Sequence, residues 1–286
     1  MIDVSTPYND ARQALRSIWR ARAPQSVLNW REANFYGRYG EVELHFLEFL
    51  CRRNADAIDV GANDGSYVHY LRRHARHVHA FEPMPHLADA LRAKFRRRVT
   101  VEAMALSDSV GTAELHMPVV DGVVVTGCST ISSNAAATYS SSRGLQVPME
   151  KLDNVYRGDV GFIKIDVEGH EHAVLGGAME TIRRCRPRLL VELDERLAPG
   201  CIERAYALFT DLGYRGFFFH AGHVQPMERF SIDKMQDRTN LPDLTAPLQA
   251  RARFGRYVYN FIFLPLPEVD PILMKVTDRL LELTRR

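Results

Sequence analysis

The feature that most constrains the fold is a nine-residue stretch at residues 57–65, with the sequence AIDVGANDG. A short apolar run ends at Asp59, and Gly61 and Gly65 follow in a turn. Ser66 is a good N-cap for the helical pattern that comes next. The stretch therefore predicts a strand, a turn and a helix at the start of an α/β sheet, where backbone N–H groups can bind a nucleotide-like ligand. Gly61 lets the backbone approach that ligand, and Gly65 supplies a positive φ or close packing against the helix.

The turn differs from the two common phosphate-binding loops. Ala62 and Asn63 leave only Gly61 and Gly65 of the dinucleotide-binding pattern, and the Gly-Lys-Ser/Thr of a P-loop is missing. A tight connection between strand and helix that binds no ligand is therefore an alternative for this turn.

A second short strand favours a ligand site. Residues 78–83 have the sequence VHAFEP, in which Glu82 follows the apolar run and Pro83 ends the strand because it lacks an N–H. Glu82 comes at about the spacing at which folds of this kind hydrogen-bond a ribose. Its carboxylate can accept hydrogen bonds from both ribose hydroxyls, so the turn and Glu82 together predict one ligand site.

Four segments in this order resemble the FkbM family of S-adenosylmethionine-dependent methyltransferases. They are DVGANDG at residues 59–65, FEP at 81–83, ALSD at 105–108 and IKIDVEGHE at 163–171. The resemblance covers roughly residues 55–195. It implies a Rossmann-like class I methyltransferase fold, with a mostly parallel seven-stranded sheet and helices on both faces, and S-adenosylmethionine as the cofactor.

The cofactor-binding residues implied by the resemblance follow the ends of expected strands. They are Asp59, Gly61, Ala62, Asn63, Gly65, Glu82, Pro83, Ala105, Leu106, Ser107 and Asp166. Alternating strands and helices predict a mostly parallel sheet, in which the carboxyl ends of the strands meet at one crevice. We therefore expect these separate segments to lie close together.

Three residues after the fourth core strand are the candidate catalytic groups: Asp166, Glu168 and His170. An alcohol acceptor reacts faster when a base removes its proton, and the unperturbed pKa of histidine, about 6.5, suits that role. Glu171 lies where a base could project as well. The alternative for these acids is cofactor binding and capping of the helix N-terminus. A pair of acids could hold a divalent ion, but the sequence offers no clear third ligand, so we assign no metal.

Length and hydrophobic periodicity predict one large α/β domain with additions, and the resemblance implies that it is a methyltransferase domain. We expect this domain at residues 55–268, with an insertion at 221–256, a helical extension at 1–54 and a C-terminal helix at 269–286. The extension is expected to form helices at 8–22 and about 41–51, as a cap or an oligomer surface. The long stretch 119–143, rich in Ser, Gly, Ala and Thr, is expected to be a lid or a substrate-facing loop, and 146–150 an edge strand.

Composition limits where the protein works and what it binds. No run of about 18 apolar residues predicts a membrane span, and the N-terminus lacks a secretory signal pattern. Four scattered cysteines favour reduced thiols and a cytoplasmic location. Arginine makes up 32 of the 37 basic residues, but the net charge of +2 argues against a nucleic-acid partner. Apolar stripes at Ala11–Trp19 and Leu273–Leu283 are candidate surfaces for a homodimer.

The expected activity is O-methyl transfer to a hydroxyl of a sugar, glycolipid or related metabolite, so that the partner is a small-molecule or glycan acceptor. Two alternatives are an NAD-dependent oxidoreductase, which would require the missing glycine of the dinucleotide pattern, and a catalytically silent scaffold that binds the cofactor. A nucleic-acid base methyltransferase would be expected to carry an Asp/Asn-Pro-Pro-aromatic motif, which the sequence lacks.

Overall fold

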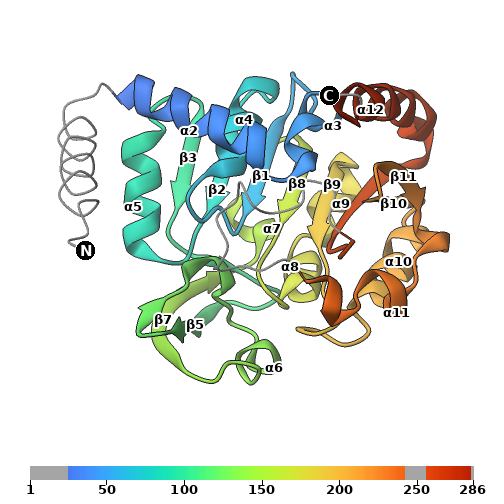
Figure 1. Cartoon of the computed structure of the whole chain (residues 1–286). Coiled ribbons are helices and arrows are strands. Elements are labelled where there is room, and N and C mark those ends of the chain that lie inside the picture. The colour runs from blue at the N-terminus through green and yellow to red at the C-terminus, as the bar shows by residue number, and fades with distance from the viewer. Residues whose placement is uncertain (1–24, 242–255, 285–286) are drawn as a thin grey trace, which may run out of the picture.

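The computed structural model describes residues 25–241 and 256–284, which form an α/β fold (Figure 1). Its main sheet has eight strands in the order β11-β10-β12-β9-β8-β1-β2-β3. Their bounds are β1 Asp56–Val60, β2 Val78–Phe81, β3 Val99–Glu102, β8 Val160–Ile165, β9 Arg188–Glu192, β10 Tyr214–His220, β11 His223–Pro226 and β12 Asn260–Pro265. The five strands from β3 to β9 pair in parallel, and the pairs of β12 with β9 and β10 and of β10 with β11 are antiparallel. The expected mostly parallel sheet is confirmed.

The sheet has one strand more than the predicted seven. The extra strand, β11, lies at the edge and comes from residues 221–256, which the sequence indicated to be an insertion. It forms a hairpin with β10, in which Phe217 pairs with Pro226. The beginning of this segment therefore extends the sheet, while residues 242–255 lie outside the described part of the chain.

Alternate residues of the central strands supply two separate cores, one on each face of the sheet. On β8, Phe162 packs into one core and its neighbour Ile163 into the other. The first face is covered by α3 Leu47–Leu50, α4 Ser66–His74, α5 Pro85–Lys94 and α12 Val269–Thr284. The second is covered by α7 Leu152–Val155, α8 Glu171–Gly177, α9 Met179–Cys185 and α10 Cys201–Asp211. The expectation of helices on both faces is therefore confirmed.

A second, four-stranded sheet forms a separate lobe, seen below the main sheet in Figure 1. Its order is β4 Ala105–Leu106, β7 Ser142–Glu150, β5 Gly111–Val120 and β6 Val123–Val124. The prediction of an edge strand at 146–150 was wrong, because β7 pairs with both β4 and β5. The stretch 119–143 is more regular than expected, since it holds β6, the 3-10 turn Thr126–Cys128 and α6 Ser133–Ala136.

Several short helical pieces lie before β1 and after β10, where the sequence predicts fewer helices. The helix expected at about 41–51 is a 3-10 turn, Val42–His45, followed by α3, and α2 Gln25–Tyr39 precedes it. The helix expected at 8–22 lies outside the described residues. The remaining helical pieces are α11 Ile232–Met235 and the 3-10 turns Met227–Arg229, Arg238–Asn240 and Leu266–Glu268.

The glycine-rich turn after β1 needs its glycines for two different reasons. Gly65 has a φ of 84°, and a Cβ there would come within 2.6 Å of Leu91 and Phe95, so both expected roles of Gly65 are confirmed. Gly65 also takes the N-cap position expected for Ser66, which is the first residue of α4. Gly61 has a φ of 79°, and a Cβ there would lie 1.9 Å from the carbonyl oxygen of Asp166. The backbones that follow β1 and β8 are therefore in close contact.

The apolar stripe of α12 is covered by the chain itself. Val276 and Leu280 are each 2% exposed and belong to the first core, against which Leu273 and Leu283 also pack. The stripe proposed for self-association is thus used within the domain, and the Ala11–Trp19 stripe lies outside the described residues. No helix among residues 25–241 and 256–284 has the length and apolar character needed to cross a bilayer.

The packing of α12 predicts different costs for two neighbouring leucines. Leu280→Ala removes a buried side chain and should lower the free energy of unfolding by about 2–5 kcal/mol. Leu281 is 42% exposed, so Leu281→Ala should change it by less than about 0.5 kcal/mol. Urea unfolding of both variants measures the difference. Equal losses, or a midpoint that rises with protein concentration in the wild type, would contradict the assignment of this stripe to the core.

Candidate functional site

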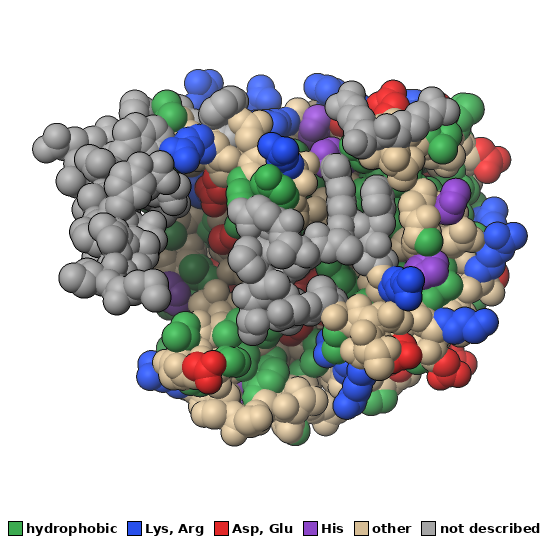
Figure 2. Space-filling view, viewed as in Figure 1, with side chains coloured by type: hydrophobic (Ala, Val, Ile, Leu, Met, Phe, Trp, Pro, Cys, Tyr) green, Lys and Arg blue, Asp and Glu red, His purple; other side chains and the backbone are tan. Residues whose placement is uncertain are grey.

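A cleft of about 600 Å³, measured with its open mouth, lies where β1, β2 and β8 end and the second sheet begins. Figure 2 shows this face hollowed above the lobe that contains β5 and β7, with hydrophobic and acidic side chains around the hollow. The lining residues are Val60, Gly61, Asn63, Phe81, Glu82, Pro83, Met84, Met104, Ala105, Leu106, Leu115, Thr126, Gly127, Ser129, Ile131, Asp166, Val167, Glu168 and His170. Separate segments therefore meet at one crevice, as the strand ends predicted.

The structure brings most of the predicted site residues to this cleft, and leaves four of them outside its lining. The predicted residues in the lining are Gly61, Asn63, Glu82, Pro83, Ala105, Leu106, Asp166, Glu168 and His170. Of the others, Ala62 is buried in the first core, Gly65 packs against α5, and Ser107 is buried behind the cleft. The fourth, Asp59, is discussed below.

Glu82 is held firmly at the end of β2. One carboxylate oxygen accepts a hydrogen bond of 2.8 Å from the N–H of Asn63, and the other accepts one of 2.9 Å from the N–H of Met84. The residue is 2% exposed, and burial raises the pKa of its carboxyl group although both N–H groups oppose the shift. The two backbone bonds fix the direction of the carboxylate, whose remaining lone pairs are available to hydroxyl donors in the cleft.

Asp59, predicted to contact the ligand or the turn, does not line the cleft. It is completely buried, and neither carboxylate oxygen has a hydrogen-bond partner among the described residues. The reason is the strand register, which pairs Asp59 with Lys164 and places their charged atoms 3.7 Å apart. Burial raises the pKa of Asp59 to about 6 although Lys164 opposes the shift.

Lys164 is one of the residues near the site that were not predicted from the sequence. Its ammonium lies 3.0 Å from the carboxylate of Asp166 and donates a hydrogen bond of 3.3 Å to the carbonyl oxygen of Gly61. Burial lowers its pKa, but the carboxylates of Asp166 and Asp59 outweigh burial and the pKa is raised. A lysine within the otherwise apolar strand VGFIKI was the available signal.

The loop after β8 is strained and braced by a buried acid. Glu168 has a φ of 53° and Gly169 a φ of 93°, both in the left-handed region. Glu171 accepts hydrogen bonds from the N–H groups of Val167 at 3.2 Å and Gly169 at 2.9 Å. Burial raises the pKa of Glu171 to about 7. Glu171 therefore stabilises the conformation of the loop. Its two hydrogen bonds from backbone N–H groups support this role better than the role of a base.

His170 lines the cleft and contacts Ser107 of the ALSD segment. Its Nε2 is 2.9 Å from Oγ of Ser107, and this hydrogen bond joins the loop after β8 to the residue that follows β4. Burial lowers the pKa of His170, with Asp108 opposing the shift. The imidazole is thus neutral at pH 7, the form that can accept a proton.

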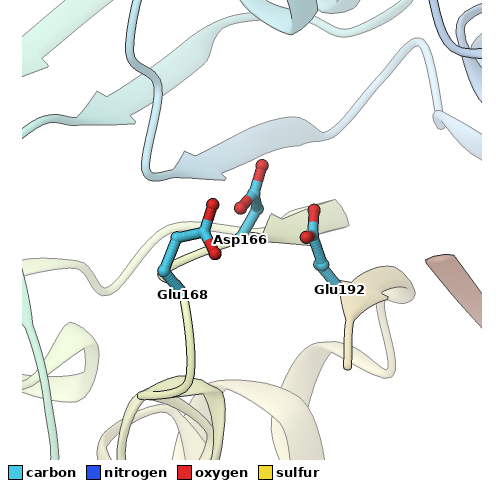
Figure 3. Close-up of side chains that lie close together, drawn as sticks. All are labelled: Asp166, Glu168 and Glu192. Atoms are coloured by element: carbon cyan, nitrogen blue, oxygen red, sulfur yellow. The ribbon is translucent and has the colours of Figure 1, made fainter. Parts of the chain in front are cut away.

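Three carboxylates come together at the ends of β8 and β9. One oxygen from each of Asp166, Glu168 and Glu192 lies within 4.8 Å of the others, and in Figure 3 the three side chains point to the same side. Glu192 is the third acid that the sequence did not reveal as a neighbour. Burial, with the nearby acids adding to it, raises the pKa of both glutamates well above the usual value. Oxygen ligands of this kind suit Mg²⁺ or Ca²⁺, while the Lys164 ammonium already contacts Asp166.

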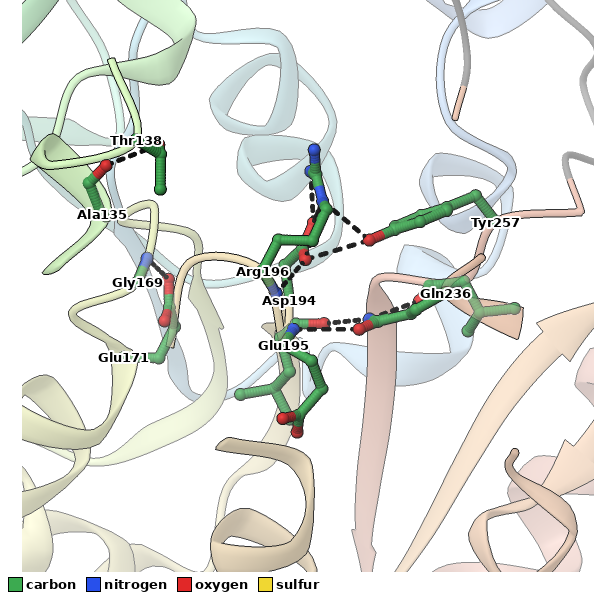
Figure 4. A network of polar contacts seen from close by, with 11 residues as sticks. Ala135, Thr138, Gly169, Glu171, Asp194, Glu195, Arg196, Gln236 and Tyr257 are labelled. Carbon is green, nitrogen blue, oxygen red and sulfur yellow. Dashed lines mark hydrogen bonds and ion pairs between the residues drawn. The ribbon is translucent and has the colours of Figure 1, made fainter. Parts of the chain in front are cut away.

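A buried glutamine ties the 221–256 segment to the strand ends of the main sheet (Figure 4). The side chain of Gln236 donates hydrogen bonds to the carbonyl groups of Leu193 at 2.7 Å and Val258 at 2.8 Å. Its side-chain oxygen accepts one of 2.9 Å from the N–H of Glu195. The segment is therefore anchored beside the carboxyl end of β9.

Next to this anchor, Arg196 forms an ion pair with Asp194, and the Tyr257 hydroxyl donates a hydrogen bond of 3.0 Å to the same carboxylate. Asp194 raises and Arg196 lowers the pKa of Glu168, so the charges of this network act on one of the three carboxylates.

The second sheet contributes one wall that sequence reasoning identified only as a segment. Thr126, Gly127, Ser129 and Ile131 line the cleft, which fits the expectation that the stretch 119–143 faces the ligand. Met84 and Met104 add apolar surface and were not predicted. Their only signal was position, because each follows a strand end by two or three residues.

A comparison with solved structures finds similarity to methyltransferases, at low sequence identity. The crystal structure of methyltransferase FkbM from Methylobacillus flagellatus KT has a TM-score of 0.46 and 15% identity, and the match covers 74% of this chain but 44% of that one. A putative methyltransferase from Streptococcus mutans in complex with SAH has a TM-score of 0.40 and 11% identity, with 78% and 94% covered. An rRNA methylase from Streptococcus thermophilus has a TM-score of 0.40 and 10% identity, with the same coverage.

No curated protein matches the chain in a sequence search. The family model of the methyltransferase FkbM domain, however, matches residues 59–215, which include the turn after β1, Glu82 and the whole loop after β8. This match spans more than half of the 286 residues. The chain therefore belongs to the FkbM methyltransferase family.

Proposed function

We propose that this chain is an S-adenosylmethionine-dependent O-methyltransferase that methylates a hydroxyl group of a sugar, glycolipid or related metabolite. The observation that carries the proposal is that one cleft is lined by two chemically different groups of side chains. Glu82 offers a fixed carboxylate, and Asp166, Glu168 and His170 offer acids and an imidazole. Membership of the FkbM family supports methyl transfer as the reaction.

The cleft residues fit S-adenosylmethionine in shape and in chemistry. A nucleoside needs hydrogen-bond acceptors for its ribose and apolar surface for its base, and the cleft offers Glu82 together with Met84, Met104 and Leu106. Gly61 lacks the Cβ that would collide with Asp166, so the backbone stays close to the cleft. When bound, S-adenosylmethionine supplies a methyl group on a positively charged sulfonium.

The chain's own contribution is orientation and proton removal. A rigid cleft that aligns an acceptor oxygen with the methyl group can lower the barrier by several kcal/mol, up to about 7–11 in model systems. His170 would accept the proton of the hydroxyl, since its lowered pKa keeps it neutral, and Ser107 would hold its ring in place. Glu168 is the second candidate base because its carboxyl group lines the same cleft.

The proposal extends to the parts of the molecule around the cleft. We assign the methyltransferase domain to residues 55–268, with the segments before and after it as additions. Cys51, Cys185 and Cys201 are buried free thiols, which supports the proposed cytoplasmic location. A small-molecule or glycan acceptor is favoured over nucleic acid because the net charge is only +2.

Incubation with radiolabelled S-adenosylmethionine and a panel of sugars, glycolipids and hydroxylated metabolites tests the activity. Label should appear on a hydroxyl oxygen of one acceptor class. Calorimetry with NAD and S-adenosylmethionine in parallel tests the oxidoreductase alternative, and we expect heat of binding from the second ligand alone. Cofactor binding without labelling of any acceptor would favour the silent scaffold.

Replacement of Glu82 tests where the ribose binds. Glu82→Ala should weaken S-adenosylmethionine and S-adenosylhomocysteine alike, by about 1.5–3 kcal/mol, because both carry the ribose and lose bonds to a charged acceptor. Titration calorimetry measures both affinities. Glu102 ends the neighbouring strand outside the cleft lining, so Glu102→Ala is the matched control and should bind both ligands normally. Unchanged affinity in a folded Glu82→Ala protein would remove the ribose assignment.

Replacement of His170 tests the base. His170→Ala should lower the methylation rate by about 10²–10⁴-fold and leave cofactor affinity nearly unchanged. The residual rate should rise with pH as the acceptor ionises by itself. His172 is the control, because its ring bonds to the carbonyl of Cys201 at 2.9 Å instead of facing the cleft. Near-normal turnover of His170→Ala would leave Glu168 as the base, or orientation alone as the source of the rate.

A further inference from the structure

We propose that Lys164 is a positioning residue of the methyl-donor site, which holds the turn after β1 and the Asp166 carboxylate in fixed relation to each other. This inference rests on the proposed function. It concerns how the cleft keeps its shape, since Lys164 does not line the cleft and cannot touch the reacting atoms.

The ammonium of Lys164 contacts both strand ends that form the floor of the cleft. It donates to the carbonyl oxygen of Gly61 at 3.3 Å and lies 3.0 Å from the carboxylate of Asp166. Gly61 and Asp166 both line the cleft, whereas the Lys164 side chain is 7% exposed. A single buried cation therefore connects two lining residues that come from different strands.

A third partner explains why a cation is stable in this place. Asp59 lies 3.7 Å from the same ammonium, and its oxygens have no hydrogen-bond partner among the described residues. Loss of Lys164 would leave this carboxylate buried and unpaired, which is costly. Charge compensation alone would account for the pair of Lys164 and Asp59. It does not account for the contacts with Gly61 and Asp166, which are directed at the cleft.

The position of the ammonium is also supported from the side away from the cleft. It lies 4.8 Å from the centre of the Tyr67 ring, a distance suited to a cation–π contact. The Tyr67 hydroxyl donates to Glu41 at 2.5 Å, and Asn260 donates to the same carboxylate at 3.1 Å. Glu41 and Asn260 lie outside the region matched by the family model. Segments from both flanks of that region thus hold Lys164 in place.

Two variants separate positioning from charge compensation. Lys164→Met removes the cation, and Lys164→Met combined with Asp59→Asn removes the unpaired charge as well. The probes are S-adenosylhomocysteine, which carries the amino-acid end beside Asp166, and adenosine, which lacks it. Calorimetry measures both affinities and thermal unfolding measures stability.

For Lys164→Met we expect a lower Tm and at least about tenfold weaker binding of S-adenosylhomocysteine, with adenosine changed less than threefold. The double variant should recover its Tm because the fully buried Asp59 charge is removed with its partner, whereas Asp166 is 25% exposed to water. It should still bind S-adenosylhomocysteine about tenfold more weakly. If Lys164→Met does not fold, the affinities for the two probes can still be compared in the charge-balanced double variant.

The control is Arg188→Met, which removes another buried, paired cation from the neighbouring strand, far from the cleft lining. It should lower Tm and leave both affinities unchanged. Recovery of S-adenosylhomocysteine binding in the double variant would overturn the proposal, as would an equal loss for both probes. Failure of the wild type to bind S-adenosylhomocysteine would instead contradict the proposed function.

Discussion

The register of β1 against β8 pairs Asp59 with Lys164 and Val60 with Ile165. Because side chains alternate between the two faces of a strand, a slip of one residue would turn Lys164 away and leave the buried Asp59 carboxylate among apolar groups. The same register brings Gly61 against the carbonyl of Asp166, a contact that only glycine allows. One strand pairing thus determines the position of the turn, of the buried ion pair and of the acids after β8.

Residues with a local signal could be placed from the sequence, and residues defined by pairing could not. Gly61, Glu82 and Asp166 each follow a short apolar run, and a parallel sheet collects such positions at one edge. Glu192 lies close to Asp166 only because β9 pairs with β8, and the residue pattern of a single strand does not determine the strand order. The pairing of Asp59 with Lys164 could not be predicted for the same reason, since Lys164 comes from a strand about a hundred residues later.

The second sheet as a whole could not be predicted from the sequence, for a different physical reason. Along β5 and β7 only Leu115, Pro118 and Val147 are buried, and the other residues are exposed or partly exposed. Strands of this kind lack the alternation of apolar and polar residues by which a half-buried strand is recognised. The composition of residues 119–143 still indicated a ligand-facing segment, because small polar residues rarely form a core.

The electrostatics of the cleft limit what the acids can contribute to the proposed reaction. Lys164 provides one positive charge near Asp59 and Asp166, and the raised pKa values of Glu168 and Glu192 reduce the remaining negative charge through proton uptake. The carboxylates around Asp166 would attract a cationic sulfonium. Because the positive charge of the sulfonium disappears as the methyl group leaves, this attraction is stronger in the bound ground state than in the transition state. Interactions of that kind aid binding and do not accelerate the step. Acceleration must then come from alignment of the acceptor and from removal of its proton, which is why a neutral imidazole at His170 matters more to the proposed rate than the acids around it.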